Sequence, residues 1–178
     1  TIGMPNPWAY RNKGLFHVSY EGGRVRLGFF AQGSHDLIAA AECRLFPDAV
    51  NELIIYLQNE LTRAGRVNYV QNILIRYSRL NGEMMVVFIT KDRAWRLGGL
   101  EKNMLRDFPQ IACIYHNINT NPKLMLGKSF TLLAGQEYLL DHIGECRFKL
   151  SPQSFFQINN EQAEALYNLV KEYAELSG

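Results

Sequence analysis

Residues 69–90, YVQNILIRYSRLNGEMMVVFIT, carry the strongest fold signal in this chain. Two largely apolar runs, Tyr69–Ser78 and Glu83–Thr90, stand on either side of the pair Asn81-Gly82. Asparagine followed by glycine favours the tight turn of a β-hairpin, because both residues accept positive φ angles. The second run is apolar without a break over residues 84–89, which indicates a strand covered on both faces. We therefore predict an antiparallel hairpin with a deeply buried second strand.

The same pattern occurs upstream, and shorter apolar runs follow downstream. Tyr10–Tyr20 and Arg24–Ala31 are separated by Glu21-Gly22-Gly23, and a Gly-Gly pair between two such runs is a hairpin signal. Four further short strands are expected, at Ile111–Asn117, Ser129–Ala134, Glu137–Leu140 and Glu145–Leu150.

Helical patterns separate these hairpins. Pro47–Ala64 has apolar residues at three- and four-residue steps, and Gly65 suits the C-terminal cap of such a helix. Leu97–Phe108 is a second helix candidate, and a third starts after Asn159, which can form a capping box with Gln162. Hairpins that alternate with helices, without regular βαβ units, predict an α+β fold with helices packed on an antiparallel β-sheet.

The bulk composition narrows the class of protein. The chain has 178 residues, of which 47% are hydrophobic and 20% charged, so it can bury a core without disulfides. A net charge of +2 excludes a dedicated nucleic-acid arm but permits RNA contact through a local patch. The cysteines, Cys43, Cys113 and Cys146, are spaced too widely for a disulfide framework or a CxxC metal knuckle. A reducing, cytoplasmic location is the simplest expectation. No apolar run approaches the roughly 18 residues of a membrane span, so we expect no membrane partner.

Two segments carry residues suited to RNA. Arg11 and Lys13 fall on the same face of a strand, so both can reach a phosphate, unless they are the solvated charges of an edge strand. In the second segment, Phe155 and its aromatic neighbour precede the amides of Gln157 and Asn159. Aromatic rings with amides can stack an unpaired base and read its edge. The alternative is that the rings belong to the core and that Asn159 only caps a helix.

Four motifs in a fixed order bear a family resemblance. They are YRNK at 10–13, GFFAQGSHDLI at 28–38, NTN at 119–121 and SPQSFFQIN at 151–159. Over residues 10–178 the chain resembles the RNA 5-methyluridine (uracil-5-) methyltransferases, which use S-adenosylmethionine, and among them the bacterial large-subunit rRNA branch. The resemblance implies that residues 1–150 are a central domain, and that 151–178 are an active-site segment and linking helix that lead toward a missing S-adenosylmethionine-binding domain.

The resemblance also implies roles for single residues. Phe155 matches a base-facing aromatic, and Gln157 matches an active-site amide near the methyl donor or the base. Asn159 matches a motif position, and Arg11 and Lys13 match a basic strand that contacts RNA. The implied partner is ribosomal RNA with a uridine target, and no protein partner is implied. The catalytic nucleophile and base are expected downstream of this chain, so we expect the fragment itself to be inactive.

The cysteines have different expected roles. Cys43 matches the last of four cysteines that hold a four-iron four-sulfur cluster in many rRNA-type members; it would be a ligand only in the parent protein, because the other three would lie before Thr1. We expect no such cluster in this fragment. Cys113 and Cys146 are interpreted as small buried hydrophobes.

Two other functions fit parts of the sequence. A stand-alone RNA-binding α+β module without catalysis would share the fold and the basic residues. A small hydrolase would use Cys113 with His116 or His142, although the apolar run around Cys113 suits a buried strand better than an exposed nucleophile.

Overall fold

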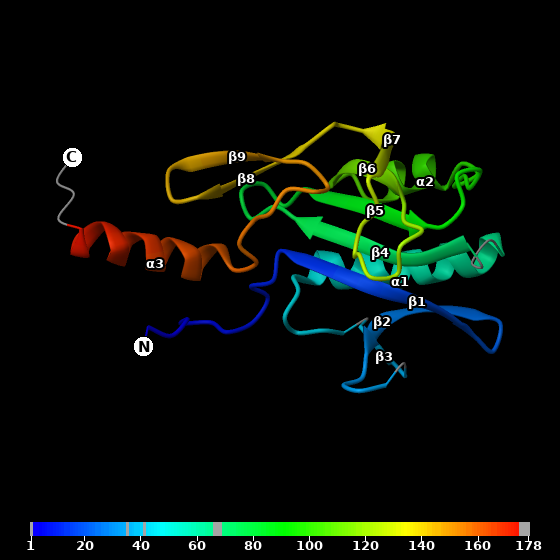
Figure 1. Ribbon diagram of the computed structural model, residues 1–178, viewed down its shortest axis with the longest axis horizontal. Coiled ribbons are helices and arrows are strands. Elements are labelled where there is room, and N and C mark those ends of the chain that lie inside the picture. Colours follow the sequence, from blue (N-terminus) through cyan, green and yellow to red (C-terminus); the bar gives the residue numbers. More distant parts are fainter. Residues whose placement is uncertain (1, 35, 41, 66–68, 175–178) are drawn as a thin grey trace.

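The computed structural model describes residues 2–34, 36–40, 42–65 and 69–174 (Figure 1). His35 of the GFFAQGSHDLI motif and the last residues of the expected C-terminal helix lie outside this part. In the described residues, seven strands form one sheet in the order β3-β2-β1-β4-β5-β6-β7, and β8 and β9 form a separate hairpin. The strands are β1 (Lys13–Glu21), β2 (Arg24–Phe30), β3 (Leu37–Ala39), β4 (Val70–Tyr77), β5 (Met84–Thr90), β6 (Ile111–Ile118), β7 (Ser129–Gly135), β8 (Leu139–Ile143) and β9 (Cys146–Leu150). The helices are α1 (Asp48–Ala64), α2 (Leu100–Asp107) and α3 (Asn160–Tyr173).

Both predicted hairpins are confirmed. β1 pairs antiparallel with β2 around Gly22 and Gly23, whose φ angles are +57° and +79°. β4 pairs antiparallel with β5, and every residue of β5 is buried. These turns form as expected because glycine takes positive φ without a steric penalty.

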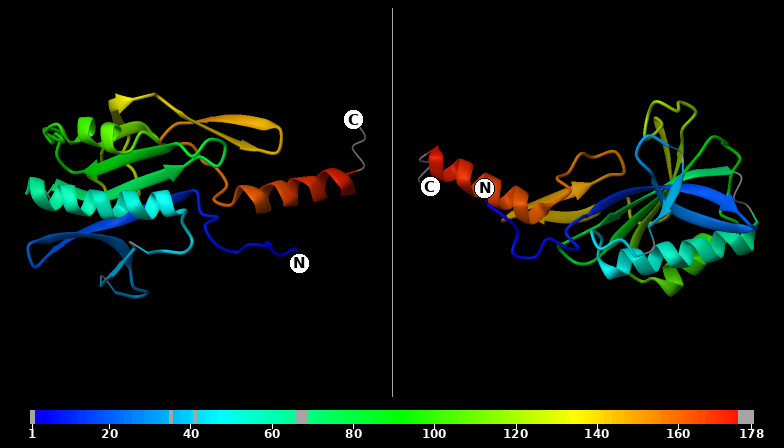
Figure 2. Two further views of the ribbon diagram at one scale, coloured as in Figure 1. Left: turned by 180° about the vertical axis from the view of Figure 1, so that it is seen from behind. Right: turned by 90° about the horizontal axis from the view of Figure 1, so that it is seen from below.

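Helix α1 also forms as predicted and covers one face of the sheet. It ends at Gly65, which has a φ of +62°, and its apolar stripe packs on Phe16 and neighbouring residues of the sheet. Helix α2 lies on the same side, as the right-hand view of Figure 2 shows. None of the helices in the described ranges is long and apolar enough to cross a membrane.

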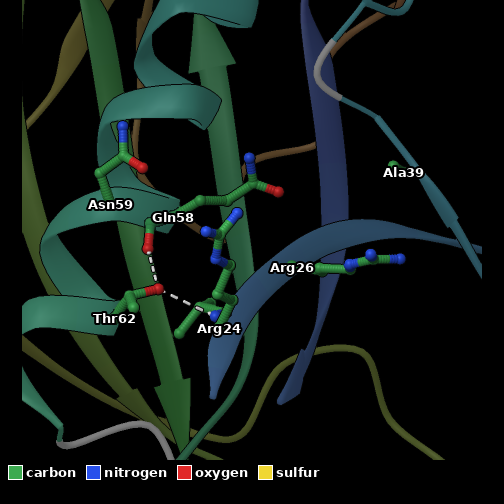
Figure 3. A pocket seen from close by; sticks show the side chains of 7 residues that line it. Arg24, Arg26, Ala39, Gln58, Asn59 and Thr62 are labelled. Atoms are coloured by element: carbon green, nitrogen blue, oxygen red, sulfur yellow. Dashed lines mark hydrogen bonds between the residues drawn. The ribbon is translucent and has the colours of Figure 1, made fainter. Parts of the chain in front are cut away.

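Side chains of α1 complete the hydrogen bonding of β2 (Figure 3). The backbone N–H of Val25 donates to Thr62 Oγ1 over 2.9 Å, and that of Leu27 donates to Gln58 Oε1 over 2.8 Å. β3 pairs only with the last three residues of β2, so these side chains serve donors that no strand reaches. The polar pocket drawn in Figure 3, which Arg24 also lines, is therefore built largely from groups that hold the fold together.

One strand pair departs from the hairpin prediction. β5 and β6 run parallel and are joined through α2, which makes a single βαβ unit inside an otherwise antiparallel sheet. Parallel neighbours need a crossover, and α2 supplies it while packing on the sheet through Leu100 and Met104. The short edge strand β3 was also not expected, because three residues leave no periodic pattern to read.

The second face of the sheet is covered by non-helical structure. A second apolar cluster joins Leu74 of β4 to Leu139 of β8 and to Phe156 in the segment before α3. Helix α3 contacts β8 at its start and then extends away from the sheet (Figure 1). The segment of residues 151–159 is thus held between the sheet and the first turn of α3.

Candidate functional site

A buried asparagine ties the segment of residues 151–159 to the start of β1. Asn12 is only 4% exposed, and its Nδ2 donates to the carbonyl of Gln157 over 2.7 Å and to Asn160 Oδ1 over 2.5 Å. Its backbone N–H donates to the carbonyl of Ile158, and its own carbonyl accepts from Tyr77. These bonds hold the backbone carbonyls of Gln157 and Ile158 in place.

The same network continues to β8. Asn160 Nδ2 donates to Asp141 Oδ1 over 3.2 Å and to the carbonyl of His142 over 2.8 Å. Asp141 is buried and also accepts the backbone N–H groups of Arg79 and His142. A buried carboxylate persists only where donors surround it, and three of them converge on one oxygen here.

A buried arginine completes the base of the site. Arg76 lies opposite Lys13 in the β1–β4 register, and its guanidinium donates to the carbonyl of Ser154. Burial lowers the pKa of Arg76 to about 10, although the carboxylate of Asp141 favours the charged form, so Arg76 is a cation at neutral pH. Burial and the charge of Arg76 also lower the pKa of Lys13. Arg76 therefore places a buried positive charge against the backbone of residues 151–159, and Lys13 lies beside it.

The segment presents its side chains in alternation. Phe155 is 84% exposed, whereas Phe156 is 8% exposed and its ring centroid lies 5.4 Å from that of Phe148. Gln157 is half-buried, with Nε2 3.5 Å from the hydroxyl of Tyr167. Together with Leu166 and other residues, Phe155 and Gln157 line a pocket of about 350 Å³. An exposed aromatic ring and an amide thus share one cavity at the start of α3.

Asn159 is the N-cap of α3, as predicted. Its Oδ1 accepts the backbone N–H of Gln162 over 3.1 Å, and its Nδ2 donates to Met4 Sδ. Both ends of this side chain are therefore used within the fold, and its contact with RNA remains a prediction.

Arg11 and Lys13 lie in different surroundings. β1 begins at Lys13, so Arg11 precedes the strand, and its guanidinium lies 5.9 Å from the ring centroid of Phe46, a residue of the α1-side core. Lys13 instead stands beside Arg76. Alternation applies only within a regular strand, which is why it did not predict the position of Arg11.

The outer face of α3 is mostly uncovered. Among four apolar residues at three- and four-residue steps along α3, only Ala163 is buried, while Leu166, Tyr167 and Val170 are 47–56% exposed. Leu166 also lines the pocket beside Phe155.

The roles of Asn12, Arg76, Asp141 and Asn160 were not predicted from the sequence. Asn12 stood inside the quoted YRNK motif. Asp141 lies inside β8, one residue beyond the strand predicted at Glu137–Leu140, and a buried polar side chain among apolar strand residues signals a structural or functional need. Neither feature of the sequence indicates which residue the side chain will hydrogen-bond.

The cysteines divide into three cases. Cys43 is half-buried, and the described ranges contain no group of three or more His, Cys, Asp or Glu side chains placed to hold a metal. Cys113 is fully buried, as expected. Cys146 is exposed, so its interpretation as a buried hydrophobe is wrong. It starts β9, in which only the last residue, Leu150, is buried.

The geometry does not support a cysteine hydrolase. Burial raises the pKa of Cys113 to about 12, and His116, three residues along β6, hydrogen-bonds Thr90 instead. Residues three apart on a strand point to opposite faces. Cys113 is therefore a protonated core thiol and not an activated nucleophile.

Thiol labelling checks this assignment. At pH 8 only on the order of one in 10,000 Cys113 side chains is a thiolate, because its pKa is about 12. We expect iodoacetamide to alkylate Cys146 at least roughly 100-fold faster than Cys113 in the folded protein, and both at similar rates in denaturant, as followed by peptide mass spectrometry. Fast labelling of Cys113 in the folded protein would instead support the function of a cysteine hydrolase.

The chain is similar in sequence to proteins named as RNA methyltransferases. An "uncharacterized RNA methyltransferase" of Bacillus cereus (strain ATCC 14579) is 33% identical over 187 residues, which are 99% of this chain and 41% of the relative. One of Staphylococcus aureus (strain MRSA252) is 33% identical over 190 residues, covering 100% of this chain and 42% of the relative. No family model matches the chain. The chain thus spans about 41% of the length of the curated relatives it matches.

A solved structure shares the fold. The crystal structure of Pyrococcus abyssi tRNA (uracil-54, C5)-methyltransferase in complex with S-adenosyl-L-homocysteine aligns with a TM-score of 0.75 and 21% identity. The alignment covers 94% of this chain and 42% of that one. The predicted resemblance is confirmed at the level of RNA methyltransferases, to which the chain is similar over about 41% of their length. The large-subunit rRNA branch stays a prediction.

Proposed function

We propose that this chain is the RNA-side central domain of an S-adenosylmethionine-dependent rRNA uracil-C5 methyltransferase. The observation that carries the proposal is the placement of Phe155 and Gln157 on one cavity, on a backbone held by the buried Asn12 network. An exposed ring on a rigid support loses little entropy when a base stacks on it.

Each side chain of the site has a task in this function. Phe155 stacks on the target uracil after it leaves the RNA stack, and Gln157 hydrogen-bonds the base or the methyl donor. Lys13 and Arg76 supply positive charge beneath the segment, which favours a phosphate nearby. The uncovered face of α3 would pack on the domain that binds S-adenosylmethionine. Arg11 and Asn159 are proposed to contact the RNA from the rim of the site.

The reaction needs groups beyond this chain. Uracil C5 becomes nucleophilic only after a thiolate adds to C6, and a base must then remove the C5 proton. Within the described residues, the only fully buried thiol is the protonated Cys113, and the exposed Cys146 lies on the outer side of the β8–β9 hairpin. We place nucleophile and base in another part of the parent protein, which we expect in the cytoplasm. A four-iron four-sulfur cluster would need three further thiolates besides Cys43.

Methyl transfer tests the proposal. The full-length parent protein, given S-adenosylmethionine labelled in its methyl group and unmodified rRNA, is expected to deposit label at uracil C5, as detected by nuclease digestion and chromatography of the nucleosides. The isolated 178-residue chain is expected to deposit none. Label on tRNA alone would correct the RNA class, and a full-length protein that binds RNA without transferring label would favour a binding module.

A further inference from the structure

The sheet face that carries the candidate site also carries a second polar region. Along β1 and β4, the pairs Lys13/Arg76, Leu15/Leu74 and His17/Asn72 follow one another on this face. Leu74 belongs to the same apolar cluster as Phe156, which places His17 on the side of the candidate site. His17 lies four positions after Lys13 on β1, a span of about 13 Å.

His17 and Asn72 line a pocket of about 250 Å³, together with Phe30, Lys91 and Asn121. The ring centroids of His17 and Phe30 lie 3.9 Å apart, and the two rings are inclined by 13°. Phe30 is 43% exposed, and His17 Nδ1 lies 2.6 Å from Asn72 Oδ1. Stacked ring surface and side-chain amides therefore meet in one cavity.

A neighbouring cavity of about 330 Å³ shares Lys91 and Asn121 and adds Arg93 and Lys128. Among the described residues that line these two cavities, none is acidic. The whole chain has a net charge of only +2, so this gathering of cations is a local feature that attracts an anion.

The β6–β7 loop that forms one wall is held in shape by side chains. Asn117 Nδ2 donates to the carbonyls of Gly127 and Ser129, and Asn119 Nδ2 donates to the carbonyl of Leu124. The loop lies on the same face as the candidate site, where Leu126 packs against the second apolar cluster (Figure 1). The wall is thus preorganised, and it contains the NTN motif at 119–121.

We propose that this pair of cavities binds a second unpaired nucleotide of the RNA substrate, apart from the uracil at Phe155; the proposal rests on the proposed function. The base packs against the rings of His17 and Phe30, and the amides of Asn72 and Asn121 bond its edge. Lys91, Arg93 and Lys128 contact the adjacent phosphates, as in other single-strand sites. The second site sets how the RNA strand lies along β1.

The charge part of the proposal is tested with Lys91→Met/Lys128→Met in the full-length protein. Both side chains are exposed, so folding should be unaffected. Binding of a fluorescein-labelled single-stranded oligoribonucleotide, followed by anisotropy over a salt series, is expected to weaken about 10-fold, and its salt slope is expected to fall by about 1.4. The matched control, Arg63→Met/Lys102→Met, removes the same charge from exposed positions on the helical side of the sheet and should change neither value.

The ring part is tested with His17→Ala and His17→Phe. The alanine variant is expected to lose about 10-fold in affinity with an unchanged salt slope, and the phenylalanine variant to retain most of the affinity. The proposal of a second nucleotide site would be overturned if Lys91→Met/Lys128→Met and Arg63→Met/Lys102→Met had equal salt slopes. It would also be overturned if His17→Ala bound the oligoribonucleotide with full affinity. Methyl transfer by the unmodified protein is measured in parallel; its absence would count against the proposed function and leave the binding comparison readable.

Discussion

Replacement of Phe155 by alanine in the full-length protein is expected to lower kcat/KM for methyl transfer roughly 10- to 100-fold. This is the loss expected when a base no longer has an aromatic side chain to stack on. The free energy of unfolding should stay within about 0.5 kcal/mol of the wild-type value, because Phe155 is 84% exposed and packs on little of the fold. Single-turnover methyl transfer measures the loss of activity, and urea denaturation measures the free energy of unfolding.

The adjacent phenylalanine is the matched control. Phe156 is 8% exposed and belongs to the apolar cluster on the second face of the sheet, so Phe156→Ala should lower the free energy of unfolding by about 3–5 kcal/mol. The same change from phenylalanine to alanine should therefore lower stability at position 156 and activity at position 155. Full activity of Phe155→Ala would remove this residue from the site.

Replacement of Asn160 by alanine is expected to lower the free energy of unfolding by about 2–4 kcal/mol. Asn160 is buried and joins Asn12 to Asp141 and to the carbonyl of His142. The variant leaves a buried amide, a carboxylate oxygen and a carbonyl with fewer partners, and none of them gains water in exchange. Methyl transfer should fall as well, because Asn12, which holds the carbonyl of Gln157, loses its second partner.

Asn159→Ala separates this effect from simple helix capping. That variant removes one capping bond, to the N–H of Gln162, and should cost about 1 kcal/mol. Urea denaturation of both variants at one pH makes the comparison. Equal losses for the two asparagines would mean that the buried network adds nothing beyond the cap.

Local signals were sufficient for much of the fold. The Asn81-Gly82 and Gly22-Gly23 turns and the apolar spacing of α1 each depend on residues close together in the chain, and each forms as predicted. The parallel pairing of β5 with β6 was not predicted, because it depends on where a crossover helix docks and not on either strand's own residues.

The candidate site divides in the same way. Phe155 and Gln157 could be selected from a motif of nine consecutive residues, and the alternation of exposed and buried rings follows from the local backbone. Arg76 could not be selected, because nothing in the run of β4 tells that its guanidinium reaches the carbonyl of Ser154, 78 residues further along the chain.

Local residue patterns were enough to predict the turns, the main helices, the cap at Asn159 and the similarity to RNA methyltransferases. The polar residues that support the site, and the position of His17 on the same face as Phe156, became visible only in the folded arrangement. The difference follows from distance along the chain. Asn12 and Asn160 are 148 residues apart, and their hydrogen bond depends on the apolar cluster that packs the sheet, β8 and the start of α3 together.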